Sequence, residues 1–154
     1  MTNNDILRRV RFVFDYSNAK MITIFANAKH EMTTDVLINM LRKESEEGYK
    51  TCNDKVFCSF LDGLVIEKRG LREGSEVPEP VSQLTNNLIF KKLRVALELK
   101  EDDIIGLLSL AEFNMSKSEL GALFRKPGHK HYKTCGDQVL RNFLAGLSLK
   151  YRGM

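Results

Sequence analysis

The segment from Phe124 to Thr134 carries the side chains best suited to chemistry in this chain. Its centre, Pro127-Gly128, is a pair typical of turns. Cations and ring-bearing side chains surround that pair, namely Arg125, Lys126, His129, Lys130, His131, Tyr132 and Lys133. Because cations bind phosphate groups and aromatic rings stack on exposed bases, this segment is predicted to contact the backbone of RNA or DNA. The alternative is a solvated loop whose tyrosine covers the core.

A metal site is a second interpretation of the same stretch, since His129, His131, Cys135 and Asp137 are chemically competent ligands. Against it, the two histidines have no counterpart in the first half of the chain, and neighbouring cations repel a metal ion. We therefore predict no metal and no cofactor. Cys52 and Cys135 occupy matched positions, which fits either a thiol activated at a helix N-terminus or a small buried residue.

A helix-turn-helix is a third interpretation, formed by residues 103–110 and 116–126. In that motif the second helix enters the major groove of DNA. Its outward positions here include Lys117, Ser118 and Gly121, with Arg125 and Lys126 near its end. This set is weakly basic, and any two short amphipathic helices give the same pattern. Base-specific readout is therefore not the leading hypothesis.

The elements that must position these residues are duplicated. Residues 4–70 align with residues 87–153 at a constant offset of 83 without a gap, and about 20 of the 67 pairs are identical. The clearest match is Tyr49-Lys-Thr-Cys52 with Tyr132-Lys-Thr-Cys135. This repeat is longer than a usual solenoid unit of about 20 to 45 residues. The chain is therefore predicted to form two pseudo-symmetric domains, 4–70 and 87–153, joined by a flexible linker at 71–86.

Each half is predicted to hold four helices, which makes the fold all-α. In the first helix, Ile6, Leu7, Val10 and Phe14 share one face at helical spacing. Gly63 recurs as Gly146 inside the last helix of each half. Because glycine costs about 1 kcal/mol relative to alanine in a helix, its use at both places predicts that another helix approaches closely there.

Helix starts are predicted from capping residues. The third helix is expected to begin at Thr33 and at Ser116, where Ser116-x-x-Glu119 forms a capping box. The last helix is expected to open with caps of the same kind, Thr51-x-x-Asp54 and Thr134-x-x-Asp137.

Charge and composition narrow the function. The net charge of +4 divides into +1 for the first repeat, −2 for the linker and +5 for the second repeat, which fits an acidic partner. Three cysteines and an N-terminus without an apolar signal segment predict a cytoplasmic protein. No run approaches the roughly 18 apolar residues of a membrane span. No catalytic signature is present, so a non-enzymatic role is predicted and no catalytic residue is named.

Several motifs together resemble the YehS-like family of bacterial proteins. They are Asn4-Asp-Ile-Leu-Arg-x-Val-Arg11, Leu41-Arg-Lys-Glu44, Phe60-Leu-x-Gly-Leu64 and Gly136-Asp-Gln-x-Leu-Arg141. The resemblance covers nearly the whole chain. It implies a small, mostly helical bacterial cytoplasmic protein with two tandem copies of a domain of unknown function, and it brings no activity and no site residue.

The function predicted from the residues is that of a binding, adaptor or regulatory module that contacts nucleic acid through the basic segment of the second repeat. The alternative is a protein-interaction or homodimerising module without nucleic-acid binding, in which the partner is another protein or a second copy of the chain. An exposed apolar patch of several hundred Å² on the folded surface would distinguish that alternative.

Overall fold

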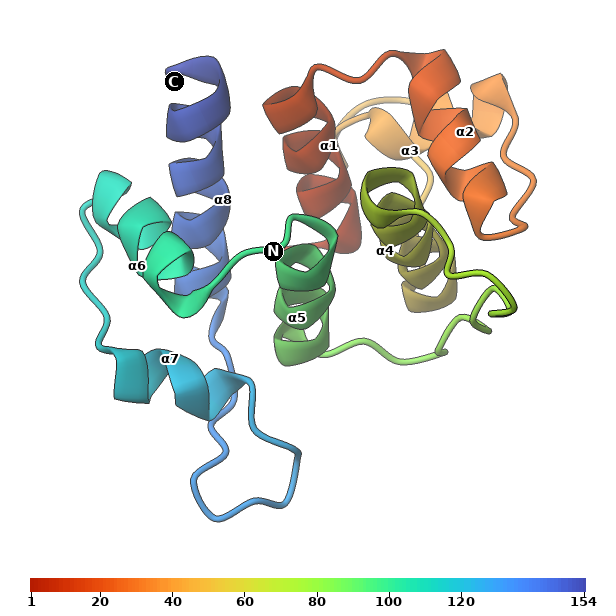
Figure 1. Ribbon diagram of the computed structural model, residues 1–154. Helices are drawn as coiled ribbons and strands as arrows, with labels where there is room; N and C mark the ends of the chain where they lie inside the picture. The colour runs from red at the N-terminus through yellow and green to blue at the C-terminus, as the bar shows by residue number, and fades with distance from the viewer. The chain divides into compact units, whose positions relative to one another are not determined.

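The structure, a computed structural model that describes residues 1–154, consists of eight α-helices and no strand (Figure 1). The prediction of an all-α fold with two tandem sets of four helices is confirmed. The first set is α1 (Asn3–Phe14), α2 (Asn18–Asn27), α3 (Thr34–Leu41) and α4 (Asp54–Arg69). The second set is α5 (Asn86–Ala96), α6 (Glu101–Leu110), α7 (Lys117–Leu123) and α8 (Asp137–Arg152).

The chain divides into two compact units, Met1–Leu84 and Thr85–Met154, and each closes a core of its own. In the first unit the fully buried side chains include Phe25, Phe57 and Phe60, and the rings of Phe25 and Phe60 lie 5.3 Å apart. In the second unit Phe90 and Phe143 are fully buried with their rings 4.6 Å apart. Burying an aromatic side chain of this size removes 150–250 Å² of surface from water, so these rings dominate each core.

The buried face of α1 differs from the predicted one at a single position. Ile6, Leu7 and Val10 are buried as expected, but Val13 occupies the fourth buried position. Phe14 is only half-buried and stacks on Tyr16 at 5.4 Å between ring centroids, with the Lys68 ammonium 4.3 Å from the Phe14 ring centroid. Phe14 therefore closes the end of the core instead of entering it.

A buried asparagine at the start of each unit holds the unit together. The Asn4 side chain, 1% exposed, donates to the carbonyls of Met40 and Lys50, both at 2.9 Å, and accepts from the Cys52 N–H at 3.0 Å. Both of its N–H groups and its oxygen are thus satisfied. These bonds join α1 to the end of α3 and to the segment that leads into α4.

The second unit repeats this arrangement at the equivalent residues. Asn87 donates to the carbonyls of Leu123 at 2.9 Å and Lys133 at 2.8 Å, and it accepts from the Cys135 N–H at 2.9 Å. The agreement between the two units extends to every partner. The asparagine contact is therefore a shared structural device of the repeat.

The prediction of a close helix approach at the repeated glycine is confirmed in both units. A Cβ atom added to Gly63 would lie 1.9 Å from the carbonyl oxygen of Ile24 on α2. At Gly146 it would lie 2.0 Å from the carbonyl oxygen of Leu107 on α6. Since van der Waals contact needs more than 3 Å, no residue except glycine fits at this crossing.

The predicted start of α3 at Thr33 and the capping box of α7 at Ser116 are confirmed, while the predicted caps of the last helix are wrong. Asn53 caps α4, and Gly136 precedes α8 without a side-chain cap. The reason lies in the carboxylates at the next position. The side chain of Asp54 accepts a hydrogen bond from Asn3, and that of Asp137 accepts one from Asn86. These aspartates therefore tie the last helix to the first.

Replacing the buried asparagine should destabilise one unit at a time. In Asn4→Ala, one buried carbonyl, one partly buried carbonyl and one buried N–H lose their partner, so the first unit should lose roughly 3 kcal/mol of unfolding free energy. Amide hydrogen exchange, read separately for residues of each unit, measures this loss. Asn114→Ala, at an exposed asparagine, is the control and should leave exchange unchanged. Equal exchange in Asn4→Ala and the control would contradict the assigned role.

The two helical glycines of the second unit offer a matched pair of substitutions. Gly146→Ala introduces a methyl group that overlaps sterically with the Leu107 carbonyl oxygen, and this should cost roughly 3 kcal/mol or more in unfolding free energy. Gly106→Ala, in a helix with no atom within 4 Å of the added Cβ, should stabilise by about 0.5 to 1 kcal/mol. Denaturant unfolding of both variants beside the parent protein tests these opposite signs.

Candidate nucleic-acid interface

The seven residues predicted to bind nucleic acid all lie on the loop between α7 and α8, hereafter the basic loop, residues 124–136. This loop runs away from the helices of its own unit (Figure 1). It turns at Gly128, whose φ of 93° falls in the left-handed region that favours glycine. Backbone bonds from the Tyr132 N–H to the His129 carbonyl at 2.9 Å and from the Lys133 N–H to the Ala122 carbonyl at 3.1 Å define its return.

The base of the basic loop is tied to α5. Asn87 receives the Cys135 N–H and donates to the Lys133 carbonyl, so both bonds fall within the last residues before α8. The third bond of Asn87 holds the Leu123 carbonyl at the end of α7. Both ends of the loop are therefore fixed by one buried side chain, and only the tip is without such support.

Exposure separates the tyrosine from the other six residues. Arg125, Lys126, His129, Lys130, His131 and Lys133 are all exposed, whereas Tyr132 is half-buried. Its counterpart Tyr49 is half-buried too, which shows that part of the tyrosine has a packing role in both units. The ring centroids of His129 and His131 lie 5.5 Å apart, and the His131 N–H donates to Nδ1 of His129 at 3.0 Å.

A hollow of about 590 Å³ lies beside the basic loop. Its loop wall consists of Arg125, Lys130, His131, Tyr132 and Lys133. The facing wall consists of residues from α6 and α7, namely Glu101, Lys117, Ser118, Glu119, Gly121 and Ala122. Five of the seven predicted residues thus share one concave surface, while Lys126 and His129 lie outside its lining.

The carboxylates that line this hollow are partly engaged in hydrogen bonds within the protein. The positively charged side chains therefore dominate the charge of the hollow. Glu119 accepts the Ser116 N–H at 3.0 Å in the capping box, and this backbone bond holds the pKa of Glu119 below its usual value. Lys117 pairs with Asp102 at 3.0 Å, and this contact raises the pKa of Lys117. Glu101 is the remaining acid of the lining.

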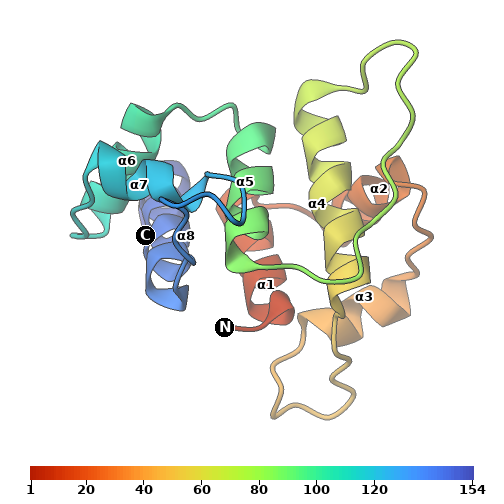
Figure 2. The ribbon, with the colours of Figure 1, turned by 90° about the horizontal axis from the view of Figure 1, so that it is seen from below.

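The equivalent loop of the first unit, residues 41–53, lies between α3 and α4 (Figure 2). It has the same anchors as the basic loop but binds its arginine differently. There the Arg42 Nε donates to Oδ1 of Asn39 at 3.1 Å, and a Cβ atom added to Gly48 would lie 3.3 Å from the same nitrogen. In the second unit Ala122 replaces Asn39, and no hydrogen bond or ion pair within the chain engages the Arg125 guanidinium. The repeat therefore presents one held arginine and one free arginine at equivalent positions.

The two matched thiols are buried and unactivated. Cys52 is 2% exposed and Cys135 is 1% exposed. Burial, with the neighbouring aspartate carboxylate as a second cause, raises the pKa of Cys52 to about 12 and that of Cys135 to about 11. Of the two interpretations of these cysteines, the small buried residue is correct and the activated thiol is wrong.

The structure contains no group of three or more His, Cys, Asp or Glu side chains placed to hold a metal ion. His129 and His131 are exposed on the basic loop, while Cys135 is buried with its thiol 3.5 Å from the Gly136 carbonyl oxygen. The four ligands considered from the sequence are therefore not brought together.

The helix-turn-helix interpretation is also limited by the structure. The helices α6 and α7 are joined by a short turn, but α7 ends at Leu123. Arg125 and Lys126 thus belong to the loop and not to a helix that could enter a major groove. The seven-residue α7 is only about 10 Å long, which leaves few outward positions for contacts to base edges.

Comparison with known proteins places both units in one family. Residues 3–70 and residues 86–153 each match the family model described as "Protein of unknown function (DUF1456)". The chain is 44% identical over 150 residues to the protein named "Uncharacterized protein YehS" from Escherichia coli (strain K12), and the match covers 97% of this chain and 96% of that protein. No solved structure gives a significant match. None of the eight helices has the length and apolar character needed to cross a membrane.

The burial of the thiols predicts both their reactivity and an alkaline loss of stability. The native protein should react slowly with a thiol reagent at pH 8, and all three cysteines, which are free, should react after unfolding. The folded state binds the Cys52 and Cys135 protons more tightly than an unfolded chain, whose thiols have a pKa of 9.0. Their contribution to stability is thus complete below pH 9 and declines as the pH rises toward 11 to 12.

The double variant Cys52→Ala/Cys135→Ala separates this effect from other alkaline titrations. Its unfolding free energy should fall less steeply above pH 9 than that of the parent protein. Identical slopes, or rapid labelling of the native protein, would contradict the burial of the thiols.

Proposed function

Because the chain belongs to the DUF1456 family of proteins of unknown function, its role must be inferred from its own residues, and we propose that it is a non-enzymatic binding module that holds an unpaired nucleic-acid strand at the basic loop. Four cations line the hollow beside this loop, against two carboxylates. Cations spaced along a concave surface follow a phosphate backbone, and this is the usual basis of sequence-independent binding.

The observation that carries the proposal is the difference between two otherwise matched loops. Both loops keep the same anchoring asparagine and the same half-buried tyrosine. Between these fixed points, the first unit has Glu44, Glu46 and Glu47, while the second has Pro127, His129 and Lys130. Since the frame is unchanged, folding does not require this change of sign. The change from acidic to basic residues supports a ligand that is negatively charged.

The free arginine supports the same conclusion. An exposed guanidinium without a partner has five N–H donors in a planar fork, a geometry that suits phosphate oxygens. The replacement of Asn39 by Ala122 removes the acceptor that holds Arg42 in the first unit. Arg125 is therefore available to a phosphate without breaking a contact inside the protein.

The rings of the hollow and the short length of α7 favour a single strand over a duplex. His131 and Tyr132 both line the hollow, and an unpaired base can stack on a ring face that a paired base cannot reach. The seven-residue α7 is too short to occupy a major groove.

Charge reversal on the basic loop tests this function. In Lys126→Glu/Lys130→Glu, binding to a fluorescent single-stranded oligonucleotide should be lost at near-physiological salt. Any residual binding at low salt should show a slope of log K against log salt that is shallower by roughly 1.4, because two phosphate contacts are removed at about 0.7 each. The control Lys43→Glu/Lys150→Glu makes the same change in charge on exposed lysines outside this loop and should bind like the parent protein.

A second variant tests the free arginine without changing charge. Ala122→Asn introduces the acceptor that holds Arg42 in the first unit, so it should tie up Arg125 and weaken binding by about tenfold. The same oligonucleotide in duplex form, and in RNA and DNA versions, shows which strand is preferred. Absence of binding by the parent protein at low salt would exclude nucleic acid and leave a protein partner.

A further inference from the structure

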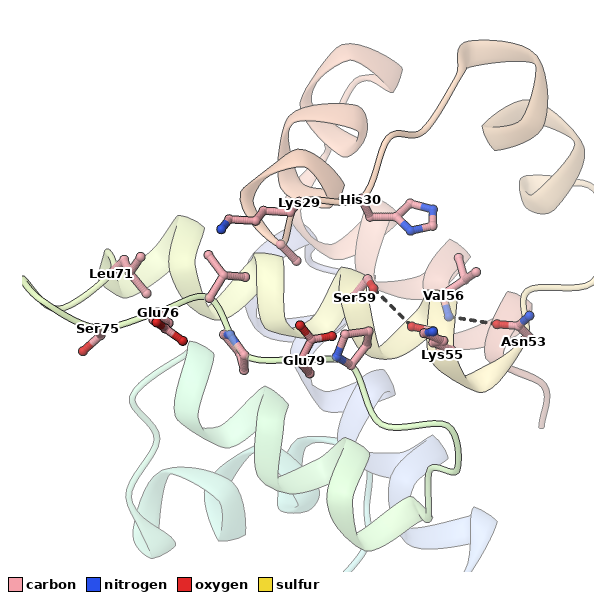
Figure 3. Close-up of a pocket in the computed structure, with 14 residues that line it drawn as sticks. Lys29, His30, Asn53, Lys55, Val56, Ser59, Leu71, Ser75, Glu76 and Glu79 are labelled. Atoms are coloured by element: carbon pink, nitrogen blue, oxygen red, sulfur yellow. Dashed lines mark hydrogen bonds between the residues drawn. The ribbon is translucent and has the colours of Figure 1, made fainter.

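A second hollow, of about 890 Å³, lies in the first unit and is hereafter called the linker cleft. Its floor is the start of α4, its upper wall is the end of α2 with the turn that follows, and its lower wall is the segment after α4 (Figure 3). That segment begins after the α4 C-cap at Gly70 and returns along α4 until the Leu84 N–H donates to the Asp54 carboxylate at 2.9 Å. The segment that forms the lower wall of the linker cleft is therefore fixed at both of its ends.

Charged side chains of both signs line the linker cleft. Figure 3 shows Lys29 and His30 on one side of α4, and Glu76 and Glu79 on the segment at its other side. Lys55 lies on the floor, so the lining contains two lysines and two glutamates. No ion pair joins these four side chains, and each is exposed. The lining thus offers unpaired positive and negative groups at the same time.

The linker cleft also offers free backbone groups. Within residues 76–83 no backbone N–H or C=O makes a hydrogen bond inside the protein. An extended chain placed beside this segment can pair with such groups as an added strand does. Val77, Pro78 and Pro80 contribute apolar surface next to them, and Val56 does so from the floor.

The second unit lacks the basic side of this cleft. At the positions equivalent to Lys29, His30 and Lys55 it has Glu112, Phe113 and Gln138. The cationic groups are therefore not part of the repeated frame, and the same holds for Lys130 of the basic loop, whose counterpart in the first unit is Glu47. Each unit has a separate set of unshared charged residues beside a hollow.

We propose that the linker cleft binds a short zwitterionic ligand of the amino-acid or peptide class, with its carboxylate toward Lys29 and Lys55 and its ammonium toward Glu76 and Glu79. The balance of two lysines against two glutamates favours a ligand without net charge.

Three probes of nearly equal size isolate the two charges. Triglycine carries both a carboxylate and an ammonium group, N-acetyl-triglycine carries only the carboxylate, and triglycine amide carries only the ammonium. Titration of the full chain, followed by amide chemical shifts of His30, Val56 and Ser59, should give an affinity for triglycine about tenfold higher than for either analogue. Free glycine, which is too short to reach both sides, distinguishes an amino acid from a peptide as the ligand.

Two charge-neutralising variants complete the test. In Lys29→Gln/Lys55→Gln, triglycine should bind no better than its amide, because the carboxylate has lost its partners. In Glu76→Gln/Glu79→Gln, triglycine should bind no better than its N-acetyl form. Both variants change exposed residues, so the fold should be retained.

Equal affinities for all three probes, or no shift at millimolar concentration, would overturn the proposed ligand class. Shifts that persist unchanged in both variants would likewise place binding elsewhere. Because the linker cleft lies wholly in the first unit, these outcomes are independent of the oligonucleotide experiments on the basic loop.

Discussion

The buried carboxamide of Asn4, repeated as Asn87, is the interaction on which each unit depends. An asparagine side chain has two donors and an acceptor, and all three are used here on backbone groups from three places in the chain. Left unpaired, those backbone groups would be costly to bury. The carboxamide thus fixes where α3 ends and where α4 begins, and it also fixes both ends of the loop between them. The geometry of the basic loop follows from Asn87 in the same way.

A constant frame makes the differences between the units informative. The two units agree in the asparagine bonds, the glycine crossing and the half-buried tyrosine, all of which serve folding. They disagree in the charges around the two hollows, where Lys130 lines one in place of Glu47, and Lys29 and Lys55 line the other in place of Glu112 and Gln138. Residues that differ within a common frame are free from its folding constraints, so binding is the role that these residues can serve.

The sequence predicted the fold class, because helical spacing and duplicated patterns are local signals. It also placed the close approach at Gly63 and Gly146, since an unfavourable residue used twice needs a reason. The role of Asn4 was not predicted, because its partners lie 36 to 48 residues away and carry no local pattern. The caps at Thr51 and Thr134 were predicted wrongly because Asn3 and Asn86, from another helix, engage the aspartates. The hollow beside the basic loop could not be predicted from the sequence, because Glu101 and Lys117 contribute to its lining from other helices.

The hydrogen bonds of each buried asparagine stay within its own unit, and this has an evolutionary consequence. Every partner of Asn4 lies in the first copy, and every partner of Asn87 lies in the second. A mutation at a loop tip in one copy therefore leaves the bonds of the other copy intact. After duplication, selection could alter the charge of one loop while its sister kept the ancestral side chains. A gene that carries both copies can thus acquire a new specificity without first losing an old one.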